Sequence, residues 1–285
     1  MSQVDYQHPK LKRADCHCHT TFSDGSLDVI TLLNHAKEKQ LDGLSITDHD
    51  TIEAYQSAVA YAKSIALPLV SGIEISTEHR RSSIHVLGYA FDLRNSDLHA
   101  FCQRLQQDRQ NRNHQILERL AKIKMPIDAE ELTTHFGHGS IGRPHIAKLM
   151  MKKGYVKSLK QAFSRYLGDK GRCYVSGYQV EVETALSLIR RAGGYAILAH
   201  PHYIRPTKIL SELLEMPFDG IEVYYGHLSL KQEQPWVDIA KKKNWLMTGG
   251  SDFHGEKKAF HTLGCSWTPE ETFALFKQRF AENSV

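Results

Sequence analysis

Short apolar runs alternate with helix-like patterns along most of the chain, and this alternation constrains the fold more than any other feature. The predicted strands are 12–17, 43–47, 69–75, 83–91, 195–199, 219–225 and 245–250. Stretches such as 27–40 and 51–66 have the pattern of helices, and Asp50 and Thr51 are predicted to cap the second. This order is typical of a parallel sheet in an α/β fold. Because seven strands leave no gap for the switch point of an open sheet, we expect a barrel.

Residues 99–178 interrupt the alternation and carry helical patterns only. Apolar residues from Phe101 to Ile123 have the spacing of an amphipathic helix, which Pro126 ends. Shorter helices are predicted at 128–136, 144–153 and 158–167. We therefore expect an all-helical insertion between the fourth and fifth strands. The predicted domains are the first part of the barrel at 12–98, the insertion at 99–178 and the second part of the barrel at 179–285.

The charge of the insertion differs from that of the rest of the chain. Residues 99–178 carry 15 Lys and Arg against 6 Asp and Glu, a net charge of +9, whereas the remainder carries 21 against 26, a net charge of −5. A basic segment in an acidic body suggests a polyanionic ligand that this segment reaches. A solvated basic helical surface without a ligand is the other interpretation.

Other properties exclude several classes of protein. No apolar run approaches the roughly 18–20 residues of a membrane span, so no membrane partner is expected. The first residues contain no apolar stretch typical of a secretory signal. The 5 cysteines are scattered and odd in number, which argues against a disulfide framework and favours the reducing cytoplasm. The sequence does not predict an oligomeric state.

The chain has 17 histidines, and many of them stand with carboxylates at predicted strand ends. The residues concerned are His17, His19 and Asp24 with the first strand, Asp48, His49 and Asp50 with the second, Glu74 with the third, His85 with the fourth, His200 and His202 with the fifth, and Asp252 and His254 with the seventh. The carboxyl ends of the strands in a parallel barrel meet on one face, where barrel enzymes place their active sites. We therefore expect these side chains to form one site.

The first strand shows which side chains would share that site. His17 and His19 are two residues apart on an extended chain, so they point the same way, and Cys16 and Cys18 point to the opposite face. We expect the two cysteines to pack in the core. Among the histidines away from strand ends, surface positions are predicted for His114 and His261, and His135, His138 and His227 are left open.

Histidine and carboxylate ligands without thiolates favour a catalytic metal site over a structural zinc site. The candidates exceed what one ion can bind, and nitrogen and oxygen ligands suit manganese, iron or zinc. Adjacent divalent ions suit the hydrolysis of phosphate esters, because they bind phosphoryl oxygens, lower the pKa of a water molecule and stabilise the developing negative charge.

The order of the motifs HCHTTFSDGS, SITDHDT, GIEIS, IHVLGY, LAHP and GGSDFHG resembles the PHP (polymerase and histidinol phosphatase) superfamily over essentially the whole chain. The resemblance implies a distorted seven-stranded (β/α) barrel with two or three divalent ions. It places His17, His19, Glu74 and Asp252 around one ion, Glu74 as a bridge to a second ion with His85 and His200, and Asp24, His49 and His254 around a third. Glu74, Asp252 and His202 are expected to be catalytic, although the resemblance assigns no specific role to His202 or Asp48.

The helical insertion contains Gly142-Arg143-Pro144-His145, which looks like the branch of 3′,5′-nucleoside bisphosphate phosphatases and RNase AM-type 5′→3′ exoribonucleases. This resemblance implies manganese as the favoured ion, with zinc or iron as alternatives, and a cap whose Arg143 and His145 bind substrate phosphate. The expected substrates are nucleoside 3′,5′-bisphosphates and 5′-monophosphorylated RNA ends. Proline fits the first turn of a helix, where free N–H groups favour an anion.

Three other functions remain open from the sequence. A small-molecule phosphatase of the histidinol-phosphate type would not need a basic cap. An amidohydrolase or deaminase also begins with His-x-His, but a single metal ion would not need the additional carboxylates. A non-catalytic RNA-binding protein is the third, and no expected ligand is missing from the chain.

Overall fold

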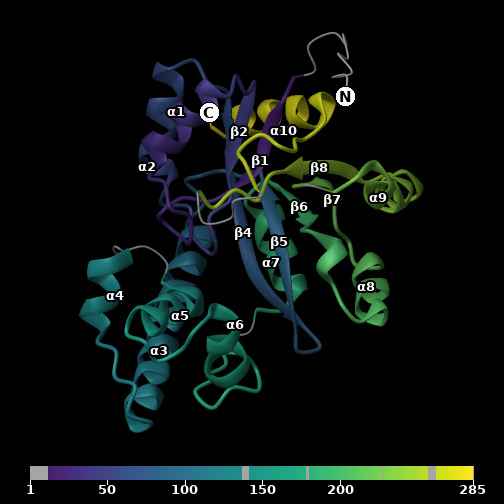
Figure 1. Ribbon diagram of the computed structural model, residues 1–285. Helices are drawn as coiled ribbons and strands as arrows, with labels where there is room; N and C mark the ends of the chain where they lie inside the picture. The colour runs from purple at the N-terminus through teal and green to yellow at the C-terminus, as the bar shows by residue number, and fades with distance from the viewer. Residues whose placement is uncertain (1–11, 137–140, 178–179, 227, 256–260, 285) are drawn as a thin grey trace, which may run out of the picture.

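The computed structural model describes residues 12–136, 141–177, 180–226, 228–255 and 261–284. Its strands form two sheets (Figure 1). The first sheet contains β1 (Ala14–Cys18), β2 (Gly43–Ile46) and β3 (Leu69–Val70). The second contains β4 (Gly72–His79), β5 (Ser82–Tyr89), β6 (Tyr195–Leu198), β7 (Gly220–Tyr225) and β8 (Leu246–Gly250). The expected α/β class is therefore present.

The predicted strand 69–75 is divided between the two sheets. Its first half, β3, pairs with β2, and its second half, β4, pairs with β5 after the single residue Ser71. This division is why eight strands replace the seven expected. Two isolated bridges link the sheets, one between His49 and Glu74 and the other between Cys18 and Phe253.

The expectation of an all-parallel arrangement is wrong for β5, which runs antiparallel to both β4 and β6. Only Arg80 and Arg81 separate β4 from β5, with φ angles of 49° and 65°. A two-residue loop with positive φ angles makes a hairpin, whereas a parallel connection needs about a dozen residues or more. The remaining pairs in both sheets are parallel.

The helices before the insertion differ from prediction at one start. The structure has α1 (Val29–Glu38) and α2 (Tyr55–Ser64). Asp28 caps α1, since its carboxylate accepts a hydrogen bond from the Thr31 amide. The cap predicted at Asp50 and Thr51 is wrong, because α2 begins four residues later and Asp50 accepts a hydrogen bond from the Ser76 amide instead.

The helical expectation for the insertion agrees closely with the structure. The elements are α3 (Ser96–Lys122), α4 (Ala129–Phe136), α5 (Arg143–Lys152), α6 (Leu159–Ala162) and the π-helical turn η1 (Phe163–Leu167). In Figure 1 this group lies below and to one side of the sheets. Its apolar side chains, from Ile116 to Val175, form a core of their own, whereas Leu98 and Cys102 at the start of α3 pack with the sheets.

After the insertion, strands and helices alternate again along the chain. Its helices are α7 (Val182–Arg191), the 3₁₀ turn η2 (Pro201–Tyr203), α8 (Thr207–Leu214), α9 (Leu230–Lys243) and α10 (Glu270–Asn283). In α10, Phe276 stacks on Tyr89 of β5 with ring centres 4.9 Å apart, and both side chains belong to one buried apolar cluster. At the seam between β8 and β1, a side chain on Gly250 would place its Cβ 2.4 Å from the His17 amide nitrogen, so only glycine allows this approach.

Candidate metal centre

β1 delivers two fully buried imidazoles to the seam between the sheets. His17 and His19 point to the same side, as their spacing predicts, and their rings lie 5.3 Å apart. Cys16 and Cys18 are also buried and unpaired, which confirms that they are core residues. An imidazole buried without water needs a partner for each nitrogen, and those partners are carboxylates from other strands.

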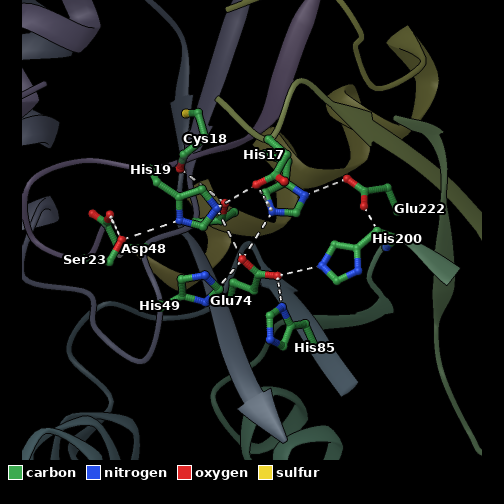
Figure 2. Close-up of polar contacts among 12 residues, drawn as sticks. His17, Cys18, His19, Ser23, Asp48, His49, Glu74, His85, His200 and Glu222 are labelled. Atoms are coloured by element: carbon green, nitrogen blue, oxygen red, sulfur yellow. Dashed lines mark hydrogen bonds and ion pairs between the residues drawn. The ribbon is translucent and has the colours of Figure 1, made fainter. Parts of the chain in front are cut away.

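Glu74 on β4 is the central carboxylate of the cluster (Figure 2). Its Oε2 lies 3.3 Å from His17 Nε2 and 3.2 Å from His19 Nε2. Its Oε1 lies 2.7 Å from His85 Nδ1 and 3.0 Å from His200 Nε2. One carboxylate thus faces two sets of histidines with separate oxygens, which is the arrangement needed to share a ligand between two ions.

Asp252 follows β8 and completes the set around the β1 histidines. Its Oδ1 lies 3.5 Å from His17 Nε2 and 3.2 Å from His19 Nε2. The Tyr225 hydroxyl of β7 donates a hydrogen bond to the other oxygen, Oδ2, at 2.6 Å. Tyr225 therefore fixes the orientation of Asp252 and leaves Oδ1 directed at the histidines.

Asp24 and His254 lie on the other side of His19. Asp24 Oδ1 is 3.1 Å from His254 Nε2, and His254 Nδ1 donates to the Asp252 carbonyl oxygen. His49 Nδ1 lies 3.3 Å from Glu74 Oε2. His49 is thus close to both Glu74 and the Asp24 group.

The geometry of these side chains fits divalent ions. Three groups have ligand atoms that all lie within 4.8 Å of one another: His19, Asp24, His49 and His254; His17, His19 and Asp252; His49, Glu74 and His85. Among the described residues, His19 Nε2, Asp24 Oδ1 and His49 Nδ1 are buried without a hydrogen-bond partner. Buried polar atoms of this kind are rare unless an ion or water binds them. Every ligand predicted from the sequence lies in this cluster.

Positive imidazole rings and negative carboxylates in the cluster shift the pKa values of one another. Burial lowers the pKa of His19, but the nearby carboxylates of Asp252 and Glu74 outweigh it and raise that pKa to about 9. Burial also raises the pKa of Glu74, but the surrounding histidines hold it well below its usual range. Protonated His19 is thus paired with buried carboxylates, whereas burial lowers the pKa of His49 to about 4 and leaves that ring neutral near pH 7.

Sequence reasoning missed Glu222, a buried carboxylate in the middle of β7. Its Oε1 accepts a hydrogen bond from His17 Nδ1 at 2.7 Å, and its Oε2 accepts one from the His200 amide at 2.8 Å (Figure 2). A carboxylate behind a metal-binding histidine fixes the ring orientation and tautomer. The signal for Glu222 in the sequence is an acidic residue within the apolar run of the predicted strand 219–225.

Asp48 also acts through its neighbours. Its carboxylate accepts hydrogen bonds from the Thr20 amide and hydroxyl, at 2.7 and 2.6 Å, and from the Ser23 hydroxyl at 2.6 Å. These contacts hold the turn that leads from His19 to Asp24. Asp48 is therefore a positioning residue for two candidate ligands.

A cavity of about 260 Å³ opens over the cluster, and we call it the metal cavity. It is lined by His49, Glu74, His85, His200, Tyr203, Tyr225, Asp252, His254 and His261. The surface position predicted for His261 is wrong: its Nδ1 donates to the Ser251 carbonyl oxygen at 2.6 Å, which turns the ring to this wall. His114 is 73% exposed, as predicted. His135 is exposed, and His138 and His227 lie outside the described residues.

His202 packs against the rings of Tyr203 and Tyr225, with ring centres 4.2 and 4.6 Å away. Both of its ring nitrogens are buried and have no hydrogen-bond partner among the described residues. Burial lowers the pKa of His202 to about 4. The ring is therefore neutral near pH 7 and lies beside the cluster rather than in it.

A second cavity of about 200 Å³ adjoins the metal cavity, with which it shares His49 and His85. Three arginines of the insertion line it, and we call it the arginine cavity: Arg109 and Arg112 from α3, and Arg143 from the start of α5. Arg109 is paired with Asp50. Arg112 Nε is buried without a hydrogen-bond partner among the described residues, and burial together with Arg109 and Arg143 lowers the pKa of Arg112 to about 9. Grouped positive charges in a partly buried cavity indicate an anion site.

The GRPH motif lies at this cavity, as expected, but its backbone contributes less than predicted. The helix start is correct, with Gly142 before α5 and Pro144 in its first turn. However, the Gly142 amide donates to His145 Nδ1 at 3.0 Å and the His145 amide donates to the Gly142 carbonyl oxygen. Because proline has no amide hydrogen, few N–H groups remain for an anion. The side chain of Arg143, which lies 3.6 Å from Asp169, is therefore a stronger candidate for binding an anion than the backbone amides.

An α/β fold that gathers buried histidines and carboxylates from several strands into groups that could hold metal ions is typical of a metal-dependent hydrolase. The chain belongs to the PHP domain family, whose family model matches residues 15–196. It is 32% identical over 248 residues to the 5′-3′ exoribonuclease of Haemophilus influenzae, which covers 85% of this chain and 90% of that protein. It is 28% identical over 267 residues to the 3′,5′-nucleoside bisphosphate phosphatase of Chromobacterium violaceum, covering 89% and 91%.

The fold is likewise similar to that of a solved structure from Bifidobacterium adolescentis assigned as a metal-dependent phosphoesterase. The TM-score is 0.83 and the sequences are 29% identical, over 95% of this chain and 98% of that one. These similarities confirm the prediction of a hydrolase that acts on phosphate esters, rather than a non-catalytic protein. In the described part of the chain, no helix has the length and apolar character needed to span a membrane.

Proposed function

We propose that this phosphoesterase removes the 3′-phosphate of nucleoside 3′,5′-bisphosphates and releases 5′-nucleotides from 5′-monophosphorylated RNA in the 5′→3′ direction. The same ester bond, between the 3′-oxygen of the first nucleotide and phosphorus, is broken in both substrates. The resemblance to an exoribonuclease and to a bisphosphate phosphatase supports both activities.

The arginine cavity is the observation that carries the proposal. It contains Arg109, Arg112 and Arg143 and shares His49 and His85 with the metal cavity. A substrate with one phosphate at the metal ligands and a second phosphate beside them would use both cavities. A small monophosphate of the histidinol-phosphate type has no second phosphate for three arginines.

The candidate ligands are those named from the sequence: His17, His19, Asp24, His49, Glu74, His85, His200, Asp252 and His254. We propose two or three divalent ions, with manganese favoured and zinc or iron as alternatives. Bound ions would supply Lewis-acid activation of water and of the phosphoryl oxygens. The side chains of this chain contribute orientation: Glu222 fixes His17, Tyr225 fixes Asp252, and Asp48 fixes the turn to Asp24.

Within the substrate site, we propose that Arg143 binds the 5′-phosphate and that His145, whose Nδ1 accepts a hydrogen bond from the Gly142 amide, also contacts substrate phosphate. Glu74 and Asp252 remain the proposed catalytic carboxylates. His202, neutral and beside the metal cavity, remains a proposed catalytic residue that would accept a proton rather than donate one.

The expectations about the barrel, the domain bounds and the location also become proposals. The two linked sheets together would form one distorted seven-stranded barrel, if β3 and β4 are counted as one strand. The separate core from Ile116 to Val175 supports an insertion domain at 99–178 between barrel parts 12–98 and 179–285. The unpaired state of all five cysteines supports a cytoplasmic location.

The test is a comparison of substrates with metal-depleted protein reloaded with manganese. We expect adenosine 3′,5′-bisphosphate to yield phosphate and adenosine 5′-monophosphate. A 5′-monophosphorylated RNA should release 5′-nucleotides from its 5′ end, and the same RNA with a 5′-hydroxyl should react more slowly. Efficient hydrolysis of histidinol phosphate, with none of the bisphosphate, would overturn the proposal in favour of the small-molecule phosphatase.

A further inference from the structure

Tyr203 is a large aromatic side chain left in solvent at the edge of the metal cavity. It stands at the end of η2, three residues after His200, and is 61% exposed. It lines the same cavity as Glu74 and Asp252. An exposed tyrosine is ordinary on a protein surface, but one beside a reaction centre is available to a substrate.

The ring of Tyr203 is supported from beneath by other rings. Tyr225 meets it edge to face, with centres 5.6 Å apart and an interplanar angle of 87°. His202 lies 4.2 Å and His200 lies 5.8 Å from its centre. Tyr203 is thus held in place by three neighbours while most of its surface remains uncovered. A ring fixed in this way loses little conformational entropy when a planar group stacks on it.

The position of Tyr203 relative to the arginines gives the direction of an RNA strand. An internal phosphodiester at the metal ligands has a nucleoside on each side. On the proposed function, the first nucleoside extends its 5′-phosphate into the arginine cavity. The second nucleoside must leave by another opening, and the metal cavity provides one whose rim carries Tyr203 and not the arginines. A nucleoside 3′,5′-bisphosphate has no second nucleoside and would not extend to this rim.

We propose that Tyr203 is the stacking surface for the base of the second nucleotide, on the 3′ side of the bond that is broken. The inference rests on the proposed function and adds a specificity-determining residue that separates RNA from bisphosphate substrates. Base–aromatic stacking accepts every base, so it suits an enzyme that removes nucleotides without regard to sequence.

The experiment compares two substrates that share their first nucleotide: adenosine 3′,5′-bisphosphate and the dinucleotide pApA. Tyr203→Ala should lower the ratio of kcat/KM for the dinucleotide to kcat/KM for the bisphosphate by about 5- to 100-fold, the range for loss of one base–aromatic stack. Tyr203→Phe retains the ring and should restore the ratio. Leu230→Ala, a change at a side chain that is 84% exposed on α9, is the control and should not alter the ratio.

A dinucleotide with an abasic second residue completes a double-mutant cycle. The kcat/KM of the wild-type protein should fall on this substrate by about the same factor as Tyr203→Ala lowers it on pApA. Tyr203→Ala should have little further effect on the kcat/KM for the abasic substrate. An equal loss by Tyr203→Ala on the bisphosphate and the dinucleotide would overturn the inference, because it would show a structural effect through Tyr225 and Asp252. Unchanged kcat/KM values of Tyr203→Ala on both substrates would overturn it as well.

A binding measurement separates this inference from the proposed function. The probe is a dinucleotide whose second base is 2-aminopurine, and it is bound to metal-depleted protein so that it is not cleaved. Stacking on Tyr203 should quench the fluorescence of that base. Quenching that disappears in Tyr203→Ala supports the inference even if bisphosphate hydrolysis fails. Binding of the dinucleotide without quenching would refute the inference and leave the proposed hydrolysis intact.

Discussion

The carboxylate of Glu222 stands directly behind the imidazole of His17, with 2.7 Å between Oε1 and Nδ1. The same carboxylate holds the His200 amide through its other oxygen. One buried side chain on β7 thereby sets the position of two candidate ligands that come from β1 and from the end of β6. Metal-binding histidines depend on partners of this kind for their tautomer and their basicity.

Glu222→Gln should weaken metal binding by about 10- to 100-fold, because an amide cannot match the carboxylate as an acceptor for His17 Nδ1–H. Activity should return when the metal concentration is raised. The measurement is a metal titration followed by phosphate release, with Glu271→Gln on the exposed face of α10 as control. A loss of activity that excess metal does not restore would show that Glu222 does more than orient ligands.

Glu74→Gln should abolish turnover, because no other carboxylate among the described residues places separate oxygens toward both histidine sets. The variant should still fold, since the amide has the shape of the carboxylate. Circular dichroism and the phosphate assay at saturating metal give the two readouts. Near-normal activity in a folded variant would be incompatible with a shared ligand at this position.

Chelation should lower the melting temperature and stop activity, because ions that bind only the folded chain stabilise it by mass action. Elemental analysis of the reloaded protein should give at least two ions per chain. The pKa of His19 is raised to about 9 in the ion-free cluster, so an ion must displace a proton below that pH. Apparent metal affinity should therefore rise with pH up to about 9, and a pH-independent affinity would contradict this reasoning.

Arg143→Ala should lower kcat/KM for a nucleoside 3′,5′-bisphosphate by about 10- to 100-fold, the effect of removing a charge-assisted contact worth roughly 1.5–3 kcal/mol. The effect should be much smaller for a nucleoside 3′-monophosphate, which has no 5′-phosphate. Steady-state kinetics on the two substrates provide the check. An equal loss on both would mean that Arg143, through Asp169 and the Leu167 carbonyl oxygen, acts only on the structure of the insertion.

Arg112→Met should weaken bisphosphate binding without lowering the melting temperature of the ligand-free protein. The guanidinium is buried beside Arg109 and Arg143, so its charge is costly until an anion arrives. Inorganic phosphate added to chelated protein should raise the melting temperature of the wild type more than that of the variant. A fall of several degrees in the ligand-free variant would indicate that Arg112 is a structural residue.

The sequence predicts which side chains lie together better than it predicts the strands that carry them. His17 and His19 follow from the alternation of an extended chain, and Asp252 and His254 follow from a strand end. His85 was expected at the end of a parallel strand, but it lies within β5, across the hairpin from Ser76. The short gap between the predicted strands 69–75 and 83–91 was the available signal, because it has no room for a crossover helix.

The residues that sequence reasoning missed act through long-range contacts. Arg109 and Arg112 lie three residues apart on one face of α3, and within a basic segment nothing distinguishes them from solvated arginines. Their role depends on how α3 sits against His49 and His85, which only the packed structure gives. Tyr225 likewise looks like a core strand residue until its hydroxyl is seen to donate to Asp252.

The seam between β1 and β8 has a consequence for the synthesis of the chain. His17 belongs to the first strand, and Asp252, 3.5 Å from it, follows the last. A nascent chain therefore presents His17 and His19 long before the carboxylate that completes their surroundings has left the ribosome. Until then the cluster lacks Asp252 and His254, so an incomplete chain cannot assemble the full set of ligands. A phosphoesterase arranged in this way gains its complete set of candidate ligands only after the whole segment from β1 to the residues that follow β8 has been synthesised.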